Sequence, residues 1–279
     1  MSRGLGRHLV LVVGGTLVAV IFVAALLAPL LAPQEHAAQT LERRLESPSG
    51  DHPLGLDELG RDILSRMLWG ARVSLGVGLA VVVLAGGLGT LIGAVAGFVG
   101  GRVDGVLMRL CDVVLAFPGI LLAIALVAVL GPALRHVVAA LVLIGWVSYA
   151  RLVRGQVLQL RELEFVVAAR AGGYPPLRIL WRHLLPNVLP VLTVQASLGM
   201  AGAILAEASL SFLGLGIQPP TPSWGAMIDA GRSHLVDAPH LALFPGLAIL
   251  ITVMGLNFLG DGLVDYLDPR QRRLYKRSE

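Results

Sequence analysis

The stretch VSLGVGLAVVVLAGGLGTLIGAVAGFVGG, residues 73–101, carries no charged side chain. It is longer than the roughly 20 residues that a helix needs to cross about 30 Å of hydrocarbon. Glycines recur along it at short spacings, namely at Gly76, Gly78, Gly86, Gly87, Gly89, Gly93 and Gly97. Small residues let helices approach closely in lipid, where dispersion holds them together. The stretch therefore predicts a membrane span that is buried among other helices.

The composition of the whole chain agrees with a lipid environment. Of its 279 residues 56% are hydrophobic and only 14% are charged, against about 25% charged in soluble domains. The single cysteine, Cys111, excludes an internal disulfide and any multi-cysteine metal site. The basic residues do not cluster on a soluble face, so a nucleic-acid partner is not expected. The only lysine is Lys276, so the chain lacks the lysine that follows the glycines of a phosphate-binding loop.

Outward from this stretch, further apolar runs predict an all-α protein with six membrane spans. They cover residues 9–32, 73–101, 106–130, 137–154, 187–216 and 241–262. The first run is too long for the apolar part of a cleaved signal peptide, so it is expected to remain as a span. With six spans both termini lie on one side. Most Lys and Arg residues fall on that side, which places both termini in the cytoplasm.

Residues 33–72 form the one sizeable connection outside the bilayer. Leu56, Ile63 and Met67 recur at helical spacing within it, with Asp57–Arg61 and Asp62–Arg66 four residues apart. This pattern predicts a short amphipathic helix that lies on the external surface of the membrane. The expected organisation is a first span plus external segment at 1–72 and a core of five spans at 73–279.

The polar loop at 155–186 contains the segment RELEFVVAARAGGYPPLRILWRHLLP (161–186). A short helix is predicted, with a small-residue face formed by Phe165, Ala168, Ala169 and Gly172. Gly173, Tyr174 and the following two prolines end that helix. A second helix of about ten residues is expected to present Arg178, Arg182 and His183, with Pro186 in the first turn of the next span. Such a helix–turn–helix is a docking surface for a soluble partner, or else an amphipathic loop resting on lipid headgroups.

This segment resembles the EAA loop of ABC importer permeases at Ala168, Ala169, Gly173, Leu185 and Pro186. Val167 occupies the position of the family glutamate. Residues 52–75, 211–228 and 256–270 are similar to blocks of the dipeptide, oligopeptide and nickel branch of that family. The four blocks occur in order over nearly the whole chain, which resembles the C-type permease subunit of a binding-protein-dependent importer.

The resemblance implies a type I ABC importer fold in a bacterial or archaeal cytoplasmic membrane. The implied partners are a homologous permease, two cytoplasmic ATPases that bind ATP and Mg²⁺, and an extracytoplasmic substrate-binding protein. The chain itself would hold no cofactor and catalyse no reaction, and its cargo would be di- or oligopeptides, with nickel or another small solute as the alternative. The residues expected to contact the ATPase are Val167, Ala168, Ala169, Arg170, Gly173, Arg178, Arg182, Leu185 and Pro186.

The remaining polar residues support fewer alternatives. The histidines show no metal-ligand spacing, so no metal site is expected. No nucleophile elbow accompanies the serines of the fifth span, so an intramembrane hydrolase is a remote alternative. A secondary transporter is also a remote alternative, because such proteins usually carry more ionisable groups inside the membrane than the one carboxylate found among these six spans.

Three carboxylates remain as candidates. Glu207 would cost at least about 2 to 3 kcal/mol if it faced lipid, so it should face the bundle interior, as a hydrogen-bond partner of another span or as a polar point on a transport path. Asp261 and Asp265, at the cytoplasmic end of the last span, are expected to contact loop arginines or to take part in gating.

Overall fold

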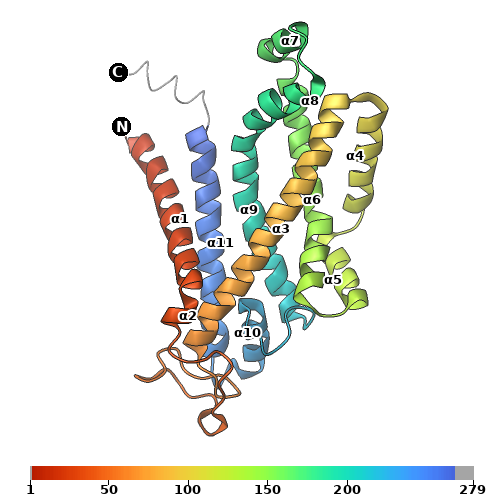
Figure 1. The fold of residues 1–279 in the computed structure, drawn as a ribbon. Helices are drawn as coiled ribbons and strands as arrows, with labels where there is room; N and C mark the ends of the chain where they lie inside the picture. Colours follow the sequence, from red (N-terminus) through yellow and green to blue (C-terminus); the bar gives the residue numbers. More distant parts are fainter. Residues whose placement is uncertain (1, 268–279) are drawn as a thin grey trace.

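A computed structural model describes residues 2–267, and its regular elements are helices (Figure 1). In chain order they are α1 (Ser2–Leu26), α2 (Ala28–Leu31), η1 (Leu41–Arg43), α3 (Ile63–Val99), α4 (Gly101–Leu115), α5 (Gly119–Leu130), α6 (Leu134–Leu160), α7 (Glu164–Ala171), α8 (Pro176–Ile179), η2 (Leu180–Leu184), α9 (Leu185–Phe212), α10 (Trp224–Gly231), η3 (Arg232–His234) and α11 (His240–Leu267). The prediction of an all-α membrane protein is confirmed.

The number of spans depends on how α4 and α5 are counted. Five helices are long and apolar enough to cross a membrane, and the pair α4–α5 makes a sixth candidate that is bent by 79°. The prediction of a single third span over 106–130 is wrong in this respect. Pro118 lacks an N–H and disfavours helical geometry at Phe117, so the helix stops at Leu115 and restarts at Gly119.

The predicted helix on the outer surface does not form as a separate element. Residues 56–62 make an irregular turn, in which Gly60 has a φ of +69°. Asp62 caps α3 by accepting a hydrogen bond from the Ser65 N–H at 2.8 Å. Because the Asp62 carboxylate is used as a cap, Arg66 pairs instead with Asp57 at 3.3 Å. The helix then runs without interruption through residue 72, the predicted boundary.

Helix α3 crosses the middle of the bundle and packs most extensively against α6 (Figure 1). The two backbones meet at glycines spaced one turn apart on α3. A Cβ atom added at Gly93 would lie 3.0 Å from the Cα of Ala150, and one added at Gly97 would lie 2.9 Å from the carbonyl oxygen of Arg154. The glycines therefore permit a backbone contact that any larger side chain would prevent.

Helix α1 lies at the edge of the bundle, along α11 (Figure 1). The contact is again made through glycine, because a Cβ atom at Gly14 would fall 2.5 Å from the backbone nitrogen of Leu259. The opposite side of α1 exposes large apolar residues such as Leu9, Val12 and Val20. An apolar exposed face of this kind suits a helix in contact with lipid.

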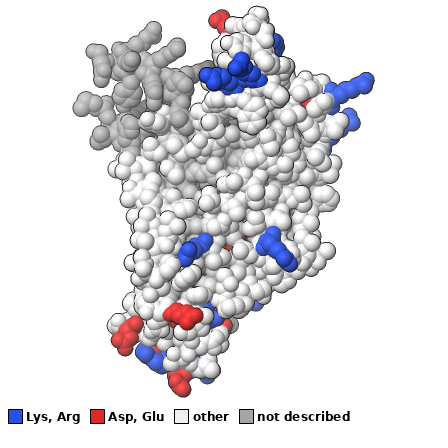
Figure 2. Space-filling model, viewed as in Figure 1, with Lys and Arg blue, Asp and Glu red and all other residues white. Residues whose placement is uncertain are grey.

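The two ends of the bundle differ in what they carry. The start of α1, the end of the described part of α11, and α7 lie at one end, whereas α2, α10 and residues 33–62 lie at the other (Figure 1). Figure 2 shows charged side chains near the α7 end and over the lower part of the visible face, with a band of uncharged surface between them. That pattern is the one expected of a membrane-spanning bundle.

Candidate functional site

Helix α7 projects beyond the spans at the end of the bundle that also carries the start of α1 (Figure 1). Its inner side is fixed to the bundle by Val166 and Ala169, which are buried in one apolar cluster with Val157 of α6 and Leu184 of η2. Residues 166 and 169 are three positions apart and share one helix face, so both point inward. The projecting helix is therefore held on a packed base.

The outer side of α7 is exposed. Val167 is 50% exposed, and Ala168 and Arg170 are also exposed. Of the residues expected to contact the ATPase on this helix, Ala169 is only 7% exposed and belongs to the internal core. Ala168 and Val167 form the surface that a docking partner could reach.

The turn after α7 depends on Gly173. Its φ is +75°, a conformation that favours glycine, and its N–H donates to the carbonyl of Arg170 at 3.1 Å. The Tyr174 N–H donates to the carbonyl of Ala169 at 3.2 Å, which closes the end of the helix. No atom lies within 4 Å of the position that a Cβ at Gly173 would take, so the turn faces open space.

The predicted second helix is continuous with the following span. A helical segment begins at Pro176, includes the wider turn η2, and passes into α9 at Leu185, with Pro186 in the first turn as predicted. Arg178 and Arg182 are exposed on it, and the Arg178 guanidinium lies 5.5 Å from the centre of the Tyr174 ring. Basic side chains are visible on this projection in Figure 2.

Arg161 is a residue at this site that the sequence did not single out. Its Nη1 donates to the carbonyl of Gly97 at 2.9 Å, which ties the end of α6 to the end of α3 just below α7. The signal available in the sequence was only its place directly after an apolar span. The segment that leads into α7 is thus joined to the end of α3.

Helix α4 is attached to α6 by two ion pairs. Arg154 Nη2 lies 2.6 Å from Asp104 Oδ2, and Arg151 pairs with Asp112. Cys111 is the one fully buried residue in the α4 helix, so the ion pairs supply contacts that apolar packing does not.

The structure describes one of the two candidate carboxylates at the end of α11. Asp261 is exposed, and no ion pair to it is found within residues 2–267. The side chain of Asp265 lies outside the described part of the structure. The expectation for these two residues stays a prediction.

Glu207 lies wholly inside the bundle, with 0% of its surface exposed. Ser74 of α3 donates to its Oε2 at 3.2 Å, and Ser211, one turn along α9, donates to its Oε1 at 2.7 Å. The hydroxyl of Ser74 also accepts from the backbone N–H of Trp224, at 3.2 Å. The carboxylate therefore links α9 to α3 and, through Ser74, to the first residue of α10.

Comparison with known proteins places these features in context. Residues 89–273 match the family described as "Binding-protein-dependent transport system inner membrane component". The dipeptide transport system permease protein DppC of Alkalihalophilus pseudofirmus is 44% identical over 97% of this chain and 89% of its own length. The glutathione transport system permease protein GsiD of Pectobacterium atrosepticum is 46% identical over 96% of this chain and 89% of its own length.

A solved structure shares the fold. A chain of the inward-facing MetNI methionine ABC transporter superposes with a TM-score of 0.52 at 20% sequence identity, covering 72% of this chain and 98% of that one. At this level of identity the likeness concerns the arrangement of helices alone.

Proposed function

Because this chain belongs to the family of inner membrane components of binding-protein-dependent transport systems, we propose that it is the permease subunit of an importer for di- and oligopeptides. Two observations support the peptide cargo: relatives more than 40% identical over nearly the whole chain are named for dipeptide and for glutathione transport. Nickel or another small solute is the competing cargo.

The observation that carries the coupling role is the projection of α7 from a packed base. Cytoplasmic ATPases, which bind ATP and Mg²⁺, dock on the exposed face formed by Val167 and Ala168, with Arg170, Arg178 and Arg182 around it. Because Val167 is apolar, this contact is made by packing and not by a carboxylate. Movement of α7 then passes into α9 through the continuous helix from Pro176 and into α3 through Arg161. The chain itself carries out no covalent chemistry.

The remaining partners follow from this assignment. The α7 end and both termini face the cytoplasm, and the opposite end, with residues 33–62 and α10, receives the substrate-binding protein. A homologous permease completes the transport path, of which this chain forms one half.

Reconstitution tests the proposal directly. The purified chain in liposomes is expected to show neither ATP hydrolysis nor uptake, because it supplies only half of a path and no nucleotide site. With its permease, ATPase and binding-protein partners, it should take up a labelled dipeptide in an ATP-dependent manner. Uptake by the chain alone would exclude the subunit role. If Ni²⁺ inhibited this uptake and unlabelled dipeptide did not, nickel would be assigned as the cargo.

Substitution of Glu207 provides a second test. Because its carboxylate is enclosed in the bundle, a role in assembly is favoured over contact with cargo. Glu207→Leu leaves the hydroxyls of Ser74 and Ser211 without their acceptor and is expected to destabilise the chain by about 1 to 3 kcal/mol, seen as a lower midpoint in thermal unfolding. Glu207→Gln keeps an acceptor and should retain most of the stability and of the uptake per folded complex. A fully stable Glu207→Gln complex without uptake would place Glu207 on the transport path.

A further inference from the structure

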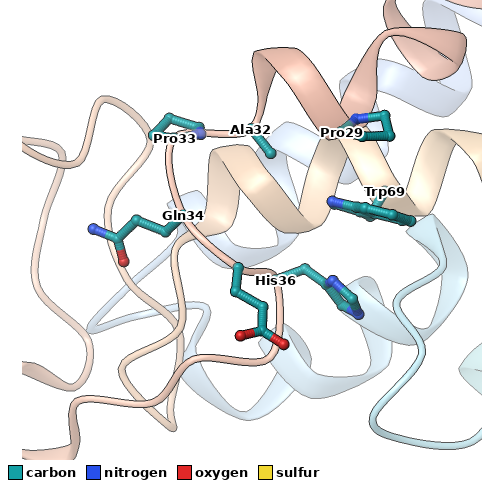
Figure 3. A pocket seen from close by; sticks show the side chains of 7 residues that line it. Pro29, Ala32, Pro33, Gln34, His36 and Trp69 are labelled. Atoms are coloured by element: carbon teal, nitrogen blue, oxygen red, sulfur yellow. The ribbon is translucent and has the colours of Figure 1, made fainter.

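The end of the bundle opposite α7 contains a pocket of about 490 Å³ between α2, the residues that follow it, and α3. It is lined by Pro29, Ala32, Pro33, Gln34, Glu35, His36 and Trp69 (Figure 3). None of these residues belongs to the coupling surface or to the surroundings of Glu207. The pocket lies where the first span ends, at the level where lipid headgroups meet a membrane protein.

Trp69 forms the wall of the pocket and has polar neighbours on its ring. In Figure 3 the indole lies between Pro29 and His36, and its ring centre is 4.9 Å from that of His36. The Arg72 guanidinium lies 5.0 Å from the same ring, one turn further along α3. Tryptophan is enriched at membrane interfaces, where its apolar ring is partly buried and polar groups surround it.

The fixed charges around the pocket are of both signs. Glu35 lines it and Arg72 lies on its aromatic wall, and both side chains are exposed. Arg66 contributes less, because it is buried and directed to Asp57 and the carbonyl of His36. A purely anionic ligand would be repelled by Glu35 and a purely cationic one by Arg72. A zwitterion with an anionic and a cationic end satisfies both groups.

Exposed apolar residues of α1 and α2 form a track that leads toward this pocket. Val23, Leu26 and Leu30 follow one another at one-turn spacing and are 52%, 69% and 82% exposed. Pro29 and Ala32, which line the pocket, continue the track. A ligand with a zwitterionic head and hydrocarbon tails fits both the pocket and the track.

We propose that this pocket binds the headgroup of a phosphatidylethanolamine molecule, whose acyl chains lie along Val23, Leu26 and Leu30. The phosphate pairs with Arg72. The primary ammonium group donates to the carboxylate of Glu35. A quaternary ammonium group has no proton to donate, so phosphatidylcholine binds less well, and phosphatidylglycerol places only negative charge beside Glu35. The site does not depend on which solute the importer carries.

Native mass spectrometry of the full-length chain with phosphatidylethanolamine, phosphatidylglycerol or phosphatidylcholine added in turn tests this site. Wild-type protein should retain phosphatidylethanolamine about two- to fivefold better than the other two lipids, the range expected for exposed ion pairs. Arg72→Gln should weaken both phosphatidylethanolamine and phosphatidylglycerol. Glu35→Gln should remove the preference for phosphatidylethanolamine and raise the retention of phosphatidylglycerol.

Two matched variants control for a loss of charge elsewhere. Arg232 lies over the Phe212 ring at 5.6 Å, and Glu42 is exposed in the same external segment; neither lines the pocket. Arg232→Gln and Glu42→Gln should leave the lipid preference unchanged. Equal retention of the three lipids by the wild type, or a preference that survives Glu35→Gln, would overturn the proposal. So would displacement of the bound lipid by a dipeptide, which would make the pocket a substrate site.

Discussion

Gly93→Leu is expected to prevent the protein from folding. A Cβ at this position already lies 3.0 Å from the Cα of Ala150, and the neighbouring atoms are backbone, which cannot rotate away. Helices α3 and α6 would have to separate along the most extensive contact in the chain. Overpacking typically costs about 1 to 3 kcal/mol and occasionally more; because the obstructing atoms here are backbone, we expect a cost at the upper end and a yield of monodisperse protein in detergent close to zero.

Gly87→Leu is the matched control for this experiment. Gly87 lies on the same helix, but no atom is found within 4 Å of the position that its Cβ would occupy. The substitution exchanges the same residues in the same helix and should leave yield and thermal stability near those of the wild type. If both variants fold equally well, the close approach of α3 and α6 is not what holds the bundle together.

These two glycines also show how far the sequence could predict the fold. The charge-free stretch and its glycines correctly predicted a span buried among helices. Which face of α3 meets which neighbouring helix was not predictable, because it depends on α6 and α9, which are distant in the sequence. Gly93 faces α6, and Gly78 faces Ile204 of α9, whereas Gly87 faces no described atom.

Local competition explains the errors in the external segment and in the third span. Asp62 was predicted to pair with Arg66 in a surface helix, but a side chain that caps the first turn of α3 is not free to do so. Pro118 signalled a break that the hydropathy of residues 106–130 concealed. In both cases a single side chain overrode the average property of its segment.

The candidate site was predictable in outline because its turn has a strong local signal. Gly173 followed by Tyr174 and two prolines ends α7 where expected, and Pro186 begins α9 as expected. The inward position of Ala169 and the unbroken passage from Pro176 into α9 were not predictable, because both depend on packing against α6. Arg161, which ties this region to Gly97, became visible only in three dimensions.

Gly173→Leu is expected to abolish coupling while leaving the membrane fold intact. Within residues 2–267, no atom beyond its chain neighbours lies within 4 Å of the position that the new Cβ would take, so we expect the side chain to project into the space that a docked ATPase would occupy. In the assembled importer, stimulation of ATP hydrolysis by the loaded binding protein should fall at least about tenfold, equivalent to about 1.4 kcal/mol of lost interface energy. The same complex should show normal insertion and a normal yield.

A second glycine separates the effect of docking from that of backbone strain. Gly131, between α5 and α6, has a φ of +91° and open space around its Cβ position, and it lies at the opposite end of the bundle from α7 (Figure 1). Gly131 has a ψ of 156°, a conformation that is essentially restricted to glycine and costs other residues about 1 to 3 kcal/mol, so thermal unfolding should shift at least as far in Gly131→Leu as in Gly173→Leu. Only Gly173→Leu should lose stimulated hydrolysis, because only its side chain stands where α7 meets a partner. Equal loss in both variants would attribute the defect to strain, and normal stimulation in Gly173→Leu would move the ATPase contact away from this turn.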